Sequence, residues 1–298
     1  FCCTVGGRCR NTVYTRFILY TIGHFERDPE LRAASVAVLR KFQDPENGLF
    51  REATHHPYHT TAHCVAALEL FDAAPLYPLK ALDPYRTPEG IVSKLESLSW
   101  LGDPRLHGHE GSGIYAALSI TGLTNSAWKD SYFGWLSENC DPDFGLGRKG
   151  MVNVQLQTAY HLFDWFHYLF NFHAANRPFP YPEKLIDTCL DLFRRKDLTE
   201  AFNHMCGFWE IDWVFCVNRA TRQTKYRFEE CRQALHEEGL ELVKMLSKTE
   251  NLSDVRRADD LHMLFGTTCA LAEVQLALPG EFQTDISLKN VLDRRPFI

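Results

Sequence analysis

Four histidines fall within nine positions of one stretch of the chain: His55, His56, His59 and His63. Pro57 suits the first turn of a helix, so the first two histidines are expected in a loop and the last two on one helical face. A zinc protease needs a glutamate between its helical histidines, as in HExxH, and the residues in between here are TTA. We therefore expect His63 in the core and His55, His56 and His59 at a binding mouth.

A glycine-rich stretch, WLGDPRLHGHEGSGIYAAL (100–118), carries a second set of polar side chains. A carboxylate beside a histidine can exchange protons near neutral pH, and glycines let backbone N–H groups approach a ligand. We expect Glu110 to act in acid–base catalysis together with His109 and with His59. Trp100, Asp103 and His107 are expected to contact the substrate. The alternative is that Asp103 only closes the turn before the next helix.

Two later segments supply further candidates. CDPDFGLGRKG (140–150) contains Arg148, and FWEIDWVFCVNRATRQT (208–224) contains Trp209, Asp212 and Arg219. Asp212 and Arg219 are seven residues apart and share a helical face, so the carboxylate either pairs with the guanidinium or faces a wet cavity. We expect Asp212 to be catalytic, and Arg148, Trp209 and Arg219 to bind substrate.

Helical periodicity runs through almost the whole chain. In residues 29–43 the apolar side chains of Leu31, Ala34, Val38 and Phe42 recur at three- and four-residue spacing, which predicts a helix. Strand signals are nearly absent. Further helices are expected at 11–25, 58–74, 88–101, 111–122, 126–140, 151–173, 182–195, 207–221, 226–247 and 258–278. The predicted fold class is all-α, built of helical hairpins.

A junction of the same form occurs twice between helices. KFQDPENGLFRE and SENCDPDFGLGRKG both run from a helix end through Asp-Pro-x-x-Gly-Leu into the next helix, and Gly48 and Gly145 are placed to adopt positive φ. Helical hairpins joined by such turns resemble the α/α-toroid superfamily, which includes six-hairpin glycosidases and lyases and the terpenoid cyclase barrels. The resemblance covers about residues 11–280. It implies a toroid or incomplete barrel of five to six hairpins, with substrate bound in a funnel at one end.

The whole chain, 1–298, is expected to form one such domain, with 1–10 irregular and 281–298 docking on the ring as a tail. Hydrophobic residues make up 45% and the net charge is -6, without a basic stripe, so neither nucleic acid nor an anionic membrane is an expected partner. No signal-peptide or membrane-spanning pattern is present. Cysteines placed singly in apolar segments, with no second CxxC-type pair, indicate free thiols and a cytoplasmic location.

We expect a carbohydrate-active enzyme, a glycoside hydrolase or polysaccharide lyase, acting on an oligosaccharide without a metal or other cofactor. Terpenoid chemistry is disfavoured because DDxxD and DxDD motifs are absent. Two alternatives remain open: a non-catalytic helical scaffold or sugar-binding protein, and a metal-dependent enzyme that uses the histidine-rich loops. A homo-oligomer is compatible with the sequence.

Overall fold

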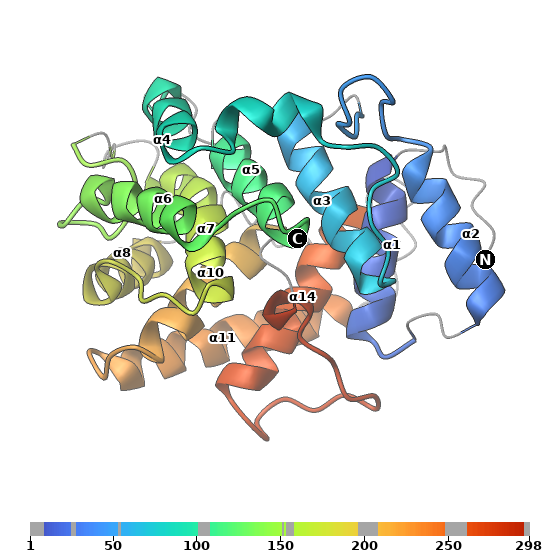
Figure 1. The fold of residues 1–298 in the computed structure, drawn as a ribbon. Coiled ribbons are helices and arrows are strands. Elements are labelled where there is room, and N and C mark those ends of the chain that lie inside the picture. The colour runs from blue at the N-terminus through green and yellow to red at the C-terminus, as the bar shows by residue number, and fades with distance from the viewer. Residues whose placement is uncertain are drawn as a thin grey trace.

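The computed structural model describes residues 9–24, 28–52, 55–100, 108–150, 152, 158–195, 208–247 and 261–294. Within these ranges the chain forms α-helices and short 3-10 helices and no strand (Figure 1), so the predicted all-α class is confirmed. Each expected helix overlaps an observed one.

The helices in chain order are α1 (Cys9–Thr21), α2 (Pro29–Arg40), α3 (Pro57–Leu70), η1 (Lys80–Tyr85), α4 (Pro88–Ser97), α5 (Gly108–Ile120), α6 (Ser126–Asn139), α7 (Thr158–Ala174), α8 (Pro182–Arg195), α10 (Phe208–Thr221), α11 (Phe228–Leu246), α14 (Leu261–Ala277) and η3 (Val291–Asp293). Proline occupies the first turn of several of them, where its missing N–H costs no hydrogen bond.

Six of the described helices contact one another in cyclic order. Helix α3 packs on α5, α5 on α7, α7 on α10, α10 on α14, α14 on α1, and α1 returns to α3. Helices α2, α4, α6, α8 and α11 alternate with these six along the chain. Because the cycle returns to its start, side chains far apart in sequence meet between its helices.

Helices α7 and α10, neighbours in this cycle, run parallel. Near the starts of α7 and α10, the rings of Phe163 and Trp209 lie 4.1 Å apart. Near the ends of the same two helices, His173 Nε2 and Arg219 Nη1 lie 3.0 Å apart. The N-terminal ends of α7 and α10 therefore lie on one side of the molecule and their C-terminal ends on the other.

Buried aromatic side chains fill much of the core. The indole N–H groups of Trp100, Trp128 and Trp213 donate to backbone carbonyls at 3.0, 2.7 and 3.0 Å. Trp135 is also buried, and its N–H donates to a carboxylate oxygen of Glu96 at 2.6 Å. These four tryptophans belong to the core instead of lining an open funnel.

The two Asp-Pro-x-x-Gly-Leu junctions adopt the same turn. Gly48 N–H donates to Asp44 O at 2.9 Å, and Gly145 N–H donates to Asp141 O at 2.8 Å. Both glycines have positive φ, +81° and +67°, as their position in the motif predicts. The Asp44 and Asp141 side chains accept backbone N–H bonds inside their own turns. Both aspartates are therefore turn formers.

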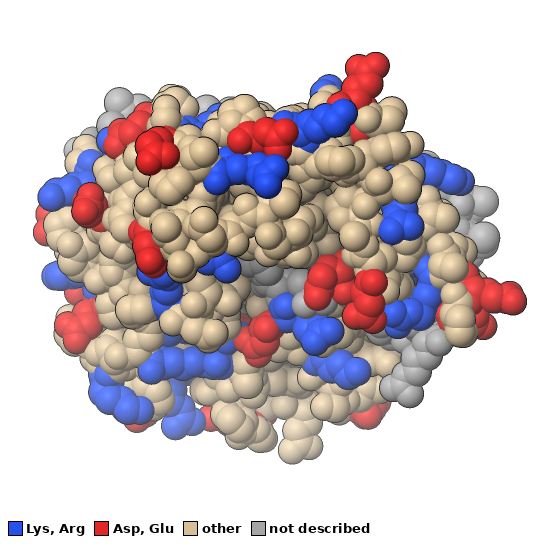
Figure 2. Space-filling view, in the orientation of Figure 1, with Lys and Arg blue, Asp and Glu red and all other residues tan. Residues whose placement is uncertain are grey.

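Charges of both signs are mixed on the surface. On the face shown in Figure 2, Lys and Arg side chains are interspersed with Asp and Glu among the described residues, without a continuous basic stripe. None of the helices in the described ranges has the length and apolar character needed to cross a membrane. Among the described residues, the following cysteines are buried and not joined in a disulfide, as expected: Cys64, Cys140, Cys189, Cys216, Cys231 and Cys269.

Candidate functional site

Five imidazole rings lie against one another between the helices of the cycle, and we call them the histidine cluster: His55, His59, His63, His167 and His262. The rings of His59 and His63 have centroids 4.3 Å apart, and those of His55 and His59 are stacked at 4.7 Å. His167 lies 5.8 Å from His59, and His262 lies 5.9 Å from His55. The cluster thus joins three helices and the turn before α3.

The helical positions explain how these rings meet. His59 and His63 are one turn apart on α3, His167 lies on α7, and His262 is the second residue of α14. Tyr14 of α1 closes the cluster, because its ring stacks on His262 at 4.7 Å and meets His63 edge-on at 5.5 Å. Side chains from four helices, α1, α3, α7 and α14, thus meet although they are far apart in the sequence.

Burial sets the protonation of His167 within this cluster. His59 and His63 are buried, and burial lowers the pKa of His167 to about 3, with a further decrease from the nearby imidazoles of His63, His262 and His55. His167 is therefore a neutral imidazole at physiological pH. The expectation that His63 is a core residue is confirmed, whereas His59 is buried with it and is not exposed at a mouth.

His55 has a carboxylate partner. Its Nδ1 lies 2.9 Å from Glu52 Oε1, and the two side chains are 17% and 7% exposed. A carboxylate only accepts hydrogen bonds, so Nδ1 carries a proton towards Glu52, and in the neutral ring the lone pair is on Nε2. Tyr14, His59 and Thr60 help to enclose a cavity of about 10 Å³ beside this pair. That is close to the space needed by one water molecule. The Glu52–His55 pair has the arrangement of a general base.

A second group of polar side chains surrounds the start of α5, and we call it the Glu110 cluster: Glu110, Lys94, His56, Tyr58 and Tyr85. Lys94 Nζ lies 2.5 Å from Glu110 Oε2, and His56 Nε2 lies 3.9 Å from the same oxygen. The hydroxyls of Tyr58 and Tyr85 are 3.1 Å apart. Burial, and then the contact with Tyr85, raise the pKa of Tyr58. Two residues predicted separately from the sequence, His56 and Glu110, are thus brought near each other, and a lysine accompanies them.

Close packing accounts for two glycines of α5. A methyl group on Gly113 would come within 2.8 Å of the Tyr58 carbonyl oxygen, and one on Gly111 within 2.4 Å of the Tyr168 hydroxyl. These distances leave no room for a side chain against α3 or α7. The glycines predicted to expose backbone N–H groups to a ligand therefore allow α5 to approach its neighbours.

The acidic side chains of α10 are buried near its start. Burial, and then the charge of Glu210, raise the pKa of Asp212 well above its ordinary value. Burial also raises the pKa of Glu210 and, to about 7, that of Glu238. Trp209 is half-buried at the same helix end and packs on Phe163. Burial therefore favours the protonated, neutral form of the Asp212 carboxyl group.

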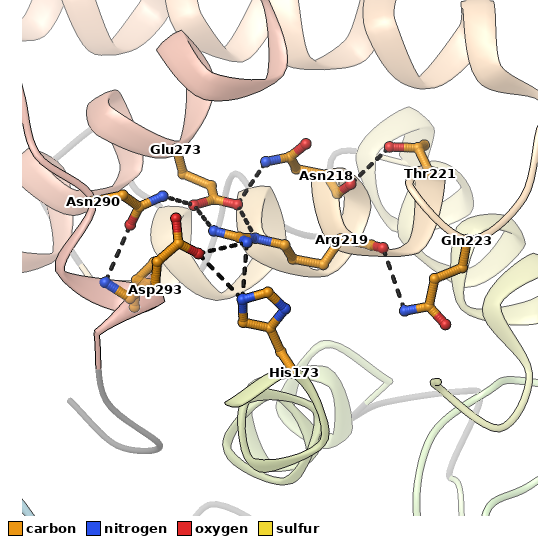
Figure 3. Close-up of polar contacts among 9 residues, drawn as sticks. His173, Asn218, Arg219, Thr221, Gln223, Glu273, Asn290 and Asp293 are labelled. Atoms are coloured by element: carbon orange, nitrogen blue, oxygen red, sulfur yellow. Dashed lines mark hydrogen bonds and ion pairs between the residues drawn. The ribbon is translucent and has the colours of Figure 1, made fainter. Parts of the chain in front are cut away.

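Arg219 belongs to a different network at the opposite end of α10 (Figure 3). Its guanidinium forms a two-armed pair with Glu273, with nitrogen–oxygen distances of 2.5 and 2.8 Å, and the two side chains are 2% and 0% exposed. Asp293 lies 2.7 Å from Arg219 Nη1. Burial raises the pKa of Asp293, but hydrogen bonding from His173 and Arg219 outweighs it and holds that pKa at about 2. Asn290 donates to Glu273 at 2.5 Å, so the network ties η3 and the segment before it to α10 and α14.

Arg148 is also engaged away from the histidine cluster. Its guanidinium donates to Asn139 at 3.1 Å and to Glu96 at 2.7 Å, and it lies 5.3 Å from the centre of the Trp135 ring. These contacts tie the turn after α6 to α4. They give Arg148 a structural explanation, and its predicted contact with substrate stays a prediction.

The predicted site residues therefore fall into separate groups. The structure brings His55 and His59 together in one cluster and His56 and Glu110 in the neighbouring one, whereas Asp212, Trp209, Arg148 and Arg219 belong to other groups of contacts. Asp103, His107 and the side chain of His109 lie outside the described residues. Sequence analysis missed Glu52, Lys94 and His167. Glu52 could have been found because it stands three residues before His55 in FREATHH.

A metal site is not formed by the residues seen here. Across the described ranges, no group of three or more His, Cys, Asp or Glu side chains is arranged to hold a metal ion. The chain matches no protein-family model, no curated protein and no solved structure. Function is therefore inferred from the side chains themselves.

Proposed function

We propose that the protein is a carbohydrate-active enzyme, a hydrolase or lyase, whose cyclic set of helices is an α/α toroid. Its acid–base site is the Glu52–His55 pair at the edge of the histidine cluster. The observation that carries the proposal is this pair: a carboxylate that fixes the tautomer of an imidazole beside a cavity the size of a water molecule. The cyclic order of helix contacts and the resemblance of the two turns support the toroid.

The pair supplies what both reaction classes require. In a lyase, His55 Nε2 would remove the proton next to a uronate carboxylate, and in a hydrolase it would take a proton from the attacking water. Glu52 would hold the ring in the required tautomer and stabilise the imidazolium that forms. The departing glycosidic oxygen would take up a proton from the pair of Lys94 and Glu110 on α4 and α5, whose carboxylate lies 3.9 Å from Nε2 of His56, the residue after His55.

Aromatic side chains support a sugar as the substrate class. Tyr160 and Trp209 are both half-buried near the N-terminal ends of α7 and α10, with ring centroids 6.2 Å apart. Flat apolar faces with a polar edge suit the C–H face of a pyranose ring. The fully buried tryptophans do not contribute to this argument.

A thermal-shift screen against mono- and oligosaccharides, including uronic acids, tests the binding part of the proposal. Ligand at a hundred times its dissociation constant stabilises a folded protein by about 2.7 kcal/mol, which for a chain of this length is about 4 °C in Tm. A sugar that raises Tm supports the proposal. A flat response to every sugar would contradict it and favour a non-catalytic scaffold, and a fall in Tm with a chelator would favour the metal-dependent alternative.

Two variants test the catalytic part on any sugar that binds. Reducing-end release would report hydrolysis, and ultraviolet absorbance of an unsaturated product would report elimination. His55→Asn should abolish turnover, whereas Glu52→Gln should lower kcat with little change in KM, because Glu52 acts through His55. His24→Asn, at an exposed histidine outside the cluster, is the matched control. Full activity in His55→Asn would refute the assignment of the base.

A further inference from the structure

Helix α2 presents an apolar stripe to solvent. Leu31 is 54% and Val38 37% exposed, and Ala34 between them is exposed as well. The buried side chains of the helix are instead Ser35 and Leu39. Leu31, Ala34 and Val38 therefore lie on the outward side of α2, whereas Phe42, just past the end of the helix, packs against the core. Helix α2 lies at the right-hand edge of the molecule in Figure 1.

The opposite side of α2 explains this orientation. Arg32 donates to Phe71 O at 3.1 Å and to Asp72 at 3.2 Å, and Arg40 donates twice to Ala74 O, at 2.7 and 3.1 Å. These bonds fix the polar side of α2 to the segment after α3. Because both arginines form hydrogen bonds there, the helix cannot rotate to bury Leu31 and Val38 without breaking those bonds.

The exposed stripe is self-complementary in charge as well as in shape. Glu30 stands in the first turn of α2, and Lys41 follows its last residue. Two antiparallel copies of the helix would place Leu31 opposite Val38 of the other copy, with the small Ala34 at the centre. Glu30 would then lie within a turn of Lys41 of the other copy. Such a two-fold arrangement needs only one surface, used twice.

We propose that α2 forms the contact surface of a symmetric dimer, in which its apolar stripe packs against the α2 helix of a second copy of this chain. The 12 residues of α2 span about 18 Å, so the buried area is small for a protein interface and the dimer dissociates on dilution. The groove of about 660 Å³ between α2 and residues 71–77 lies alongside, where Leu76 is also exposed.

Sedimentation velocity on the full chain over a wide concentration range tests the dimer. The wild-type mass should rise with concentration from 34.3 kDa toward twice that value. Leu31→Glu should remain monomeric throughout, and because the residue is exposed the variant should keep its fold. Leu240→Glu is the matched control, since Leu240 is 52% exposed on α11 and should leave dimerisation unchanged.

Charge reversal then tests the antiparallel geometry. Glu30→Lys alone and Lys41→Glu alone should each weaken the dimer, and the two together should restore it, because each new charge again faces its opposite. A monomer at every concentration would overturn the proposal. A dimer unaffected by Leu31→Glu would also overturn it, because the contact would then lie on another surface.

Discussion

The neutral state of His167 predicts a loss of stability in mild acid. Burial and three neighbouring imidazoles lower its pKa from 6.5 to about 3. In the unfolded chain the same side chain takes up a proton as the pH falls through 6.5, while in the folded protein it stays neutral until about pH 3. Protons therefore favour the unfolded state between pH 6.5 and about pH 3. The contribution of the neutral His167 ring to the free energy of unfolding is fully present only above pH 6.5.

The size of the effect follows from the two pKa values. At pH 5 the unfolded state binds about one proton more at this site, and the free energy of unfolding is lower than at pH 8 by about 2 kcal/mol. For a chain of 298 residues this corresponds to about 3 °C in Tm. Replacing His167 by glutamine, which does not titrate, should remove this part of the pH dependence.

Urea unfolding followed by tryptophan fluorescence at pH 8 and pH 5 measures the effect directly. The difference in unfolding free energy between the two pH values should be about 2 kcal/mol smaller in His167→Gln than in the wild type. His24→Gln, at an exposed histidine, should keep the wild-type difference. An unchanged difference in His167→Gln would refute the assignment of a buried, neutral imidazole at this position.

Two further predictions concern the scaffold. Gly48→Ala should lower the free energy of unfolding by roughly 2–5 kcal/mol, because φ is +81° and the new methyl group would lie 1.9 Å from Pro78 O. Gly122 has a φ of +71° and open space around it, so Gly122→Ala should lower the free energy of unfolding by only about 1–2 kcal/mol in the same experiment. Glu273→Gln should lower the free energy of unfolding by about 3–5 kcal/mol, because it leaves the buried Arg219 without its main partner. Replacing both members of that pair by apolar residues should recover most of the loss, and no recovery would contradict a charge-based explanation.

The helices and the two turns could be predicted because their signals are local. Apolar spacing and a proline in the first turn depend on residues a few positions apart, and the positive φ of Gly48 follows from its place in the motif. The buried face of α2 could not be predicted in this way. Periodicity shows that Leu31 and Val38 share a side, but the bonds of Arg32 and Arg40 to residues 71–74 decide which side faces the core.

The candidate site depends on contacts between distant segments, and sequence spacing recovers it only in part. His55 and His59 could be singled out from one short stretch, whereas His167 joins them only because α7 and α3 face each other across the cycle. One of the two alternatives for Asp212, a pair with Arg219, is not formed, and the reason is geometric. Seven residues along a helix are about 10 Å, so the two side chains share a face without touching, and Arg219 meets Glu273 of the neighbouring helix instead.

The histidines of the cluster cannot all have the same role. A general base works best when its pKa lies near the operating pH, and His167, with a pKa of about 3, gains too little by taking up a proton at neutral pH. His167 is therefore a positioning residue, which packs as a neutral ring against His59. His55 differs because Glu52 can balance the positive charge that it gains on accepting a proton. Proton transfer in the proposed reaction is thus expected at the edge of the cluster, where His55 is partly exposed, and not at its buried centre.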